Sequence, residues 1–204
     1  MFYTDNWIST WVLENITSQN EFIARIAKFL SEINSFGQMW LLLAIVITVV
    51  YSIRKKKVSL YLIVAIIPVC LIWALSEYGL KEWVGRLRPY QEIEGFTAIY
   101  DLINYKYPSG ASFPSNHTLV SFAAAFIVFK FDKKLAPYAY VLAILIALSR
   151  LVLGAHYASD IIAGMGLGTL AGVIASLIAD KLSPKVDNFI NLKIENRKKK
   201  NAAR

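Results

Sequence analysis

The 204-residue sequence predicts an all-α, polytopic transmembrane helix bundle, and three observations support this fold class. Hydrophobic residues make up 56% of the chain, and its mean hydropathy is +0.47. The apolar residues are gathered in runs that approach the roughly 20 residues needed to cross a hydrocarbon layer as a helix. Short basic clusters stand at the ends of these runs, where membrane proteins carry their orientation signals. We therefore expect one integral membrane domain with five or six spans.

The first 36 residues have an amphipathic pattern rather than a spanning one. Apolar side chains such as Trp7, Trp11 and Phe29 are interspersed there with Asp5 and Glu14. A helix with this pattern lies in the membrane interface, with its apolar face toward the lipid. Residues 1–36 are therefore assigned to amphipathic interfacial helices, and a sixth span is expected only if this region crosses the membrane.

Five apolar runs follow, at about 37–53, 58–79, 118–130, 135–153 and 160–180, and the third is short for a span. The last run contains small residues that allow another helix to approach closely; they are Gly164, Gly166, Gly168, Gly172, Ala171 and Ala175. We assign the transmembrane lipid-facing domain to residues 37–182. Residues 183–204 are assigned to a basic cytoplasmic tail, and its last stretch, NLKIENRKKKNAAR (Asn191 to Arg204), is expected to be disordered.

The net charge of +8 is distributed in a way that indicates orientation rather than nucleic-acid binding. Basic clusters follow the first, third and fifth runs, at Arg54–Lys57, at Lys130 with Lys133 and Lys134, and at Arg197–Lys200. If five spans alternate, all three clusters fall on one side, which the positive-inside rule makes cytoplasmic. A nucleic-acid binder would instead gather its charge into one patch. We expect a multi-pass protein of the cell (inner) membrane that contacts the bilayer and no nucleic acid.

Three stretches at the opposite side place ionisable residues at the edges of spans. They read KEWVGRLRP (Lys81 to Pro89), FPSNHT (Phe113 to Thr118) and SRLVLGAHYASD (Ser149 to Asp160). Ionisable side chains are costly in such places unless they have a partner. Lysine and arginine match the oxygens of a phosphate, and a helix N-terminus after Pro114 favours an anion. These stretches predict a phosphate pocket with Lys81, Arg88 and Arg150 as its cations.

The two histidines of the chain lie in the same stretches and predict a division of labour. If the segment is helical, Asp160 is an i, i+4 neighbour of His156 and can hold one ring nitrogen, which leaves the other free to attack phosphorus. His117 has no adjacent carboxylate and is the candidate general acid. Arg86 is interpreted as a head-group or interface cation, and Glu77 as an i, i+4 partner of the lysine that follows it.

These stretches, which read K-x6-R-P, P-S-x-H and S-R-x5-H-x3-D, resemble the three signatures of the type 2 phosphatidic acid phosphatase (PAP2) family, in the family's order. The resemblance covers about residues 37–180. It implies a lipid phosphatase that needs neither a metal nor another cofactor and is related in its site to vanadium haloperoxidases. It also implies that His156 forms a phosphohistidine intermediate.

The resemblance carries further roles to matching positions of this chain. It implies that His117 is the acid, that Asp160 orients His156, and that phosphate is bound by Lys81, Arg88, Ser115, the backbone at Asn116 and Arg150. The family usually has glycine where Asn116 stands. We therefore expect the Asn116 side chain to influence which head group fits.

The predicted function is hydrolysis of the terminal phosphate of a membrane lipid phosphate or diphosphate at the periplasmic or exterior face. From the family, undecaprenyl diphosphate and phosphatidylglycerol phosphate are favoured, and phosphatidic acid and lipid A 1-phosphate stay open. One alternative is a non-hydrolytic phospholipid binder or transporter, which needs the cations but neither histidine. A vanadate-dependent peroxidase is a second alternative, although that class is typically soluble. The oligomeric state is left open.

Overall fold

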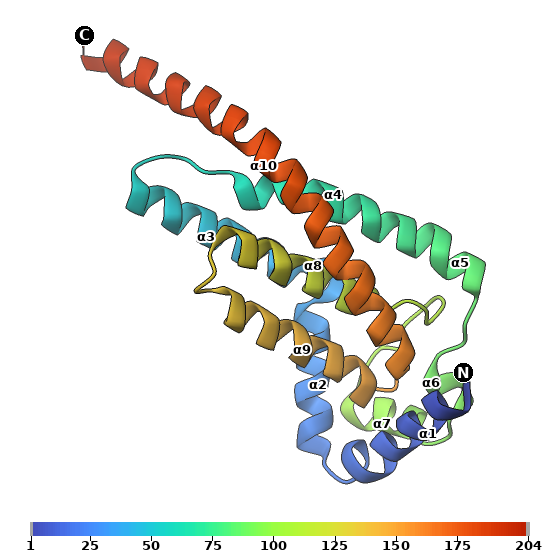
Figure 1. Ribbon diagram of the computed structural model, residues 1–204. Helices are drawn as coiled ribbons and strands as arrows, with labels where there is room; N and C mark the ends of the chain where they lie inside the picture. The colour runs from blue at the N-terminus through green and yellow to red at the C-terminus, as the bar shows by residue number, and fades with distance from the viewer. Residues whose placement is uncertain (1, 203–204) are drawn as a thin grey trace.

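The computed structural model describes residues 2–202, which form helices joined by short turns and loops (Figure 1). The helices are α1 (Phe2–Val12), α2 (Glu21–Ile33), α3 (Gln38–Lys55), α4 (Tyr61–Leu75), α5 (Lys81–Val84), α6 (Pro89–Glu92), α7 (Phe96–Ile103), α8 (Asn116–Phe131), α9 (Ala136–Val152) and α10 (Ala158–Ala202). Three short turns of other helical types join some of them: η1 (Leu13–Thr17), η2 (Ser35–Gly37) and η3 (Ser76–Leu80). The predicted all-α class is confirmed.

Five apolar helices occupy the positions of the five predicted spans. By length and apolar composition, three stretches of the described chain are able to cross a membrane: Gln38–Lys55, Tyr61–Glu92 and Ala158–Lys199. The other two, α8 and α9, have 16 and 17 residues and are shorter apolar helices. Since about 20 residues cross the hydrocarbon layer as a helix, these two helices are shorter than a full span.

The short helix α8 lies at the centre of the bundle. On one side, Phe122 and Ala125 pack in a cluster with Ala143 of α9. On another side, Ala123 and Ile127 pack in a cluster that includes residues of α4 and α10. Because α8 is enclosed by other helices, it carries the second sequence stretch on a rigid support.

The small-residue face of α10 is used within the chain, against α8. A Cβ atom at Gly168 would lie 2.3 Å from the Leu119 carbonyl oxygen, and one at Gly164 would lie 2.7 Å from the carbonyl oxygen of Ser115. Gly172 is similarly close to Ala123, whereas a Cβ at Gly166 would meet nothing within 4 Å. The predicted close packing is therefore confirmed for three of the four glycines.

The N-terminal helices fold against the turn between α9 and α10 (Figure 1). Ala24 and Ala27 of α2 are buried in a cluster with Phe96 and Leu153, whereas Phe22 remains exposed. One face of this region therefore packs on the protein, and its place in the membrane interface stays a prediction. At 11 and 13 residues, α1 and α2 are too short to be spans.

The expectation of a disordered tail is wrong for the described residues, because α10 continues as a helix of 45 residues to Ala202. Two of its polar side chains hold the loop between α3 and α4. Asp187 Oδ1 accepts a hydrogen bond from Leu60 N at 2.8 Å, and Asn191 bonds to both backbone polar groups of Val58 at 3.1 and 3.2 Å. Ala203 and Arg204 lie outside the described residues.

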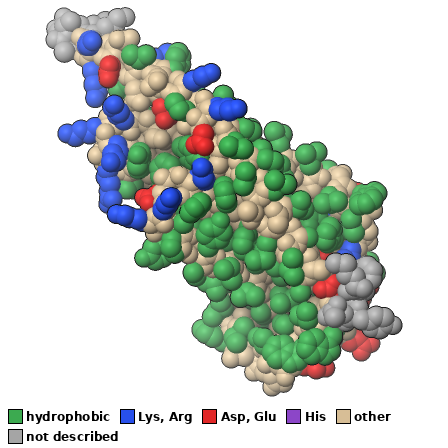
Figure 2. All heavy atoms as spheres, in the orientation of Figure 1, with side chains coloured by type: hydrophobic (Ala, Val, Ile, Leu, Met, Phe, Trp, Pro, Cys, Tyr) green, Lys and Arg blue, Asp and Glu red, His purple; other side chains and the backbone are tan. Residues whose placement is uncertain are grey.

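Charge separates the two ends of the bundle. Figure 2 shows Lys and Arg side chains gathered toward the end where α10 terminates. The α3–α4 and α8–α9 loops lie at this end too, and the α9–α10 turn lies at the other (Figure 1). The basic clusters and the three sequence stretches are thus at opposite ends, as predicted from alternating spans.

The contact between α8 and α10 gives a stability prediction with an internal control. Gly168→Ala must push Leu119 backbone away and is expected to cost about 1–3 kcal/mol, the usual range for overpacking. Gly166→Ala adds a methyl group in open space and improves helix propensity, so its stability is expected to be equal or higher. Thermal denaturation of the two variants in detergent measures this. Equal melting temperatures would contradict the close contact.

Candidate active site

The three sequence stretches meet in one polar cavity of about 400 Å³ at the end of the bundle opposite the basic clusters. Its lining includes Lys81 of α5, Arg88 at the start of α6, His117 of α8, Arg150 of α9 and His156 of the α9–α10 turn. The structure therefore brings together side chains that are far apart in the chain. Ser115 and Asp160 are fully buried and are not among the lining residues.

Arg88 is held in place by backbone carbonyl groups. Gly85 ends α5 with a left-handed conformation, and Arg88 is extended in front of Pro89, so the chain turns back toward the bundle. The guanidinium donates hydrogen bonds to the carbonyl oxygens of Ser109, Gly110, Ala111 and Ala155, at 2.8–3.2 Å. This network orients a positive charge without neutralising it.

His156 is buried beside this cation, with its Nε2 3.2 Å from Arg88 Nη1. The ring also hydrogen-bonds to the backbone of Ser112. Burial holds the pKa of His156 well below its usual 6.5, and the positive charges of Arg88, Arg150 and Lys81 lower the pKa further. The ring is therefore neutral at neutral pH and keeps a lone pair.

The predicted contact between His156 and Asp160 differs from what the structure contains. His156 precedes the first residue of α10, so the two residues are not helical i, i+4 neighbours. Their closest nitrogen and oxygen atoms, His156 Nδ1 and Asp160 Oδ2, are 3.7 Å apart, which is too long for a hydrogen bond. Asp160 Oδ2 instead accepts a bond from Tyr157 N at 2.9 Å, as acidic residues do in the first turn of a helix.

Ser112 lies between the histidine and the carboxylate. Its Oγ donates to Asp160 Oδ2 at 2.5 Å and is 3.5 Å from His156 Nδ1. The side chain is fully buried. The sequence reasoning missed Ser112, because a small polar residue in a loop has no distinctive pattern; its only signal is its place two residues before Pro114.

Lys81 is paired with Glu77, as predicted. The Lys81 Nζ and Glu77 Oε2 atoms are 2.7 Å apart. The same oxygen accepts a bond from Asn116 Nδ2 at 2.6 Å, and Ser76 Oγ donates to Asn116 Oδ1 at 2.6 Å. The Asn116 side chain therefore fixes the partner of Lys81, and its influence on head-group choice stays a prediction.

Arg150 and His117 are supported by residues that the sequence analysis did not select. Arg150 Nη1 donates to Tyr105 Oη at 2.7 Å and to Ser31 Oγ of α2. The His117 ring hydrogen-bonds to the backbone of Ser31. Arg150 Nε and His117 Nε2 are buried and have no hydrogen-bond partner within the described part of the chain. Both residues are among those that line the polar cavity.

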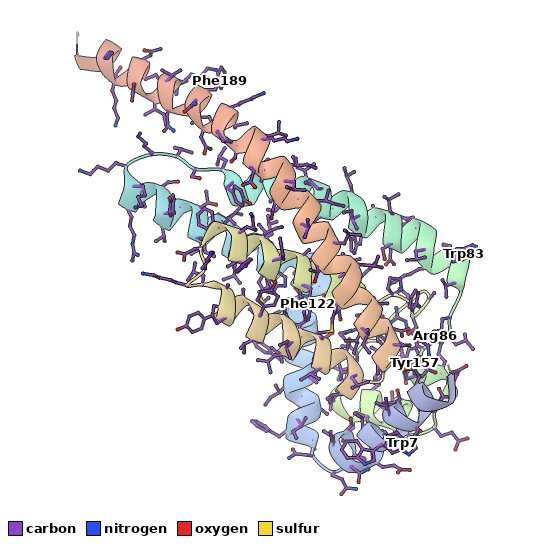
Figure 3. All side chains as sticks on the ribbon, viewed as in Figure 1. Trp7, Trp83, Arg86, Phe122, Tyr157 and Phe189 are labelled. Carbon is purple, nitrogen blue, oxygen red and sulfur yellow. The ribbon has the colours of Figure 1, made fainter. Side chains whose placement is uncertain are left out.

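The interpretation of Arg86 as a head-group cation is wrong. Its side chain is largely buried between α1 and α10, where Nη2 is 3.0 Å from Asp5 Oδ2 and Nη1 is 2.6 Å from Asp160 Oδ1. The guanidinium carbon also lies 3.9 Å from the centre of the Tyr157 ring, and Figure 3 shows these two side chains side by side. Arg86 is therefore a buried ion-pair partner. The spacing of the motifs could not predict this, because one of its partners, Asp5, lies outside the motifs.

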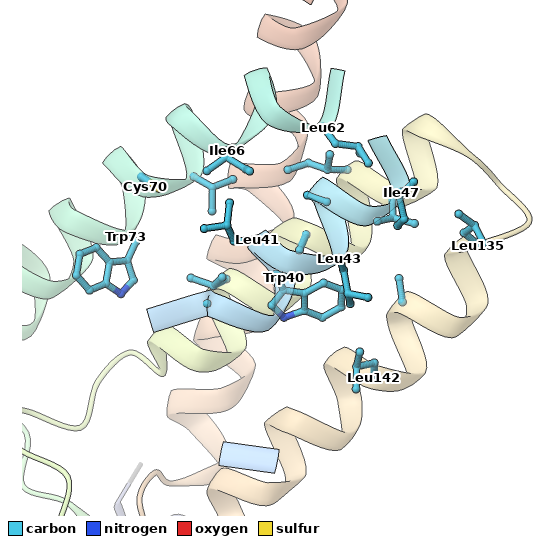
Figure 4. A pocket seen from close by; sticks show the side chains of 18 of the residues that line it. Trp40, Leu41, Leu43, Ile47, Leu62, Ile66, Cys70, Trp73, Leu135 and Leu142 are labelled. Atoms are coloured by element: carbon cyan, nitrogen blue, oxygen red, sulfur yellow. The ribbon is translucent and has the colours of Figure 1, made fainter. Parts of the chain in front are cut away.

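A second, apolar cavity of about 750 Å³ adjoins the polar one and lies between α3, α4, α8 and α9 (Figure 4). Side chains such as Trp40, Leu62 and Leu142 line it. Gly37, Trp73 and Val120 line both cavities. A polar cavity beside an apolar one fits a molecule with a charged head and a hydrocarbon chain.

Comparison with known proteins agrees with this geometry. Residues 40–184 match the family model of the PAP2 superfamily. The chain is 32% identical over 146 residues to the bacitracin transport permease protein BcrC of Bacillus licheniformis, which covers 71% of this chain and 68% of that one. It is also 30% identical over 147 residues to a lipid A 4'-phosphatase of Bacteroides thetaiotaomicron, and this match covers 69% of this chain and 65% of that one.

A solved structure has the same fold. It is the crystal structure of a transmembrane PAP2-type phosphatidylglycerolphosphate phosphatase from Bacillus subtilis, with a TM-score of 0.66 at 21% identity, covering 88% of this chain and 86% of that one. Residues 40–184, which match the family model, contain all three sequence stretches and both histidines. The chain therefore belongs to the PAP2 superfamily.

Proposed function

We propose that this protein hydrolyses the terminal phosphate of a membrane lipid phosphate or diphosphate through a phosphohistidine intermediate, without a metal ion. The observation that carries the proposal is the placing of two histidines and three cations around one polar cavity, which shares lining residues with an apolar cavity. Family membership and the phosphatases among the similar proteins support the reaction class.

In the first step, His156 Nε2 attacks phosphorus. A nitrogen–phosphorus bond forms, the bond from phosphorus to the leaving oxygen breaks, and His117, which enters the step in its protonated form, gives that oxygen a proton and becomes neutral. In the second step, water attacks the phosphohistidine, the nitrogen–phosphorus bond breaks, and His117 takes the proton of the water. The low pKa of His156 supports its role as nucleophile, because the neutral ring has the lone pair that attack requires.

The cations supply the electrostatic part of the reaction. Lys81, Arg88 and Arg150 offset the charge on the phosphate oxygens, which is the larger share of catalysis in phosphoryl transfer. Arg88 contacts His156 Nε2, and a bound phosphate gives the N–H groups of Arg88 new acceptors. Binding of the substrate thus frees the lone pair of the nucleophile.

The hydrocarbon chain of the substrate is proposed to lie in the apolar cavity. This cavity is lined by apolar side chains and does not select a head group. Undecaprenyl diphosphate and phosphatidylglycerol phosphate therefore stay the favoured substrates, ahead of phosphatidic acid and lipid A 1-phosphate. One similar protein is named a transport permease, which is the class of the non-hydrolytic alternative. Two histidines among the residues that line the polar cavity favour hydrolysis over transport.

The first prediction concerns the reaction itself. The native protein in detergent with EDTA is expected to release phosphate from at least one lipid phosphate or diphosphate of a panel, and His156→Ala is expected to release none, because it has no nucleophile. Phosphate release is measured by a colorimetric assay, and size-exclusion chromatography checks that the variant is folded. No release by folded native protein from any lipid would favour the lipid-binding alternative, and activity lost in EDTA would contradict metal independence.

A second prediction concerns orientation. The active site is proposed to face the periplasm or exterior of the cell (inner) membrane, because the basic clusters lie at the opposite end. In a Cys70→Ala background, a cysteine at exposed Glu94 is expected to react with an impermeant thiol reagent in intact cells or spheroplasts, and one at exposed Lys134 is not. The reverse labelling would place the reaction on the cytoplasmic side.

A further inference from the structure

We propose that Asp5, in the N-terminal helix α1, is a positioning residue of the active site that acts through Arg86 on Asp160. The inference rests on the proposed function. Asp5 lies outside residues 40–184, which match the PAP2 family model, so it belongs to the part of this chain that the family signatures leave out.

The contacts of Asp5 tie α1 to the start of α10. Its carboxylate is almost entirely buried and accepts three hydrogen bonds. Oδ2 accepts from Arg86 Nη2 at 3.0 Å and from Ser159 Oγ at 2.6 Å, and Oδ1 accepts from Ser159 N at 3.1 Å. A carboxylate is favourable here, because the N–H groups of a first helical turn lack partners within the helix. Asp5, near the start of the sequence, thereby holds Ser159, the residue next to Asp160.

Arg86 is shared between two carboxylates. Its Nη1 is 2.6 Å from Asp160 Oδ1 on one side, and its Nη2 contacts Asp5 on the other. One guanidinium and two carboxylates leave a net charge of −1 in this buried group. Loss of the Asp5 charge makes this group less negative by one unit, so the group presents less negative charge to His156.

That negative charge matters because of what faces His156. Arg88 contacts its Nε2, Arg150 and Lys81 add positive charge, and His117 lies in the same cavity. Glu77 offsets part of the charge of Lys81, and on the Nδ1 side the ring faces Ser112 and Asp160. Phosphorylation of Nε2 places positive charge on the ring. The Asp160 carboxylate, on the Nδ1 side of the ring, can balance this charge only if the positive charge of Arg86 does not neutralise it completely.

The test compares Asp5→Asn with the native full-length protein, using the lipid that the native protein hydrolyses fastest. We expect kcat to fall about tenfold with little change in KM, since the substrate does not touch this group. His156 must be neutral to attack, so its pKa sets the acid limb of the kcat/KM profile. Loss of a negative charge lowers that pKa, so the limb is expected to move to lower pH by about half a unit. Glu14→Gln, which neutralises an exposed carboxylate of the same region, is the matched control and is expected to leave the profile unchanged.

A double variant separates charge from architecture. Asp5→Asn with Arg86→Gln removes one negative and one positive charge, so its acid limb is expected to return close to the native position. The double variant can be measured even if the single variant Asp5→Asn does not fold. A purely structural role for Asp5 would leave the limb of Asp5→Asn unmoved, or shift it further in the double variant, and either result would overturn the inference. If the native protein releases no phosphate, the proposed function fails and the inference falls with it; an active native protein with an unaffected Asp5→Asn overturns the inference alone.

Discussion

The whole arrangement depends on holding three cations close together in a buried cavity at the edge of a membrane bundle. Charges of one sign in such a place repel one another and lose hydration, so each needs polar partners that do not neutralise it completely. Arg88 has four backbone carbonyl oxygens, Lys81 has Glu77, and Arg150 has hydroxyl groups. Carbonyl and hydroxyl groups orient a guanidinium while leaving its charge in place. The cavity therefore remains positive, as the proposed phosphate substrate requires.

The fold supplies these partners from many parts of the chain. The central helix α8 is locked against α10 through glycines, which fixes the N-terminus of α8 relative to the α9–α10 turn. The loop before α8 provides carbonyl groups for Arg88 and the hydroxyl of Ser112, and α2 provides Ser31 for both Arg150 and His117. The N-terminal helices are thus part of the site's framework as well as of the molecular surface.

Hydropathy and motif spacing are local signals, so the sequence was sufficient for the class of fold, the apolar helices and several residues that line the polar cavity. These residues are Lys81, Arg88, Asn116, His117, Arg150 and His156; the predicted Ser115 and Asp160 do not line it. The sequence was insufficient for the surrounding residues. Asp5, Ser31 and Ser112 act through partners far away in the chain, and an isolated aspartate or serine has no pattern that names its partner. The same reason explains the error over Arg86, whose two carboxylate partners come from opposite ends of the sequence. The tail was predicted from charge alone, whereas its helix is fixed in part by contacts of Asp187 and Asn191 with another loop.

The central claim is that His156 becomes covalently phosphorylated, and trapping the intermediate tests it most directly. The protein would be mixed with a lipid substrate labelled with ³²P in the terminal phosphate, quenched in alkali within the first turnover, digested and mapped by mass spectrometry. The account predicts acid-labile, alkali-stable label on the peptide that contains His156. Rapid phosphate release with no protein-bound label, or label on a different residue, would contradict it.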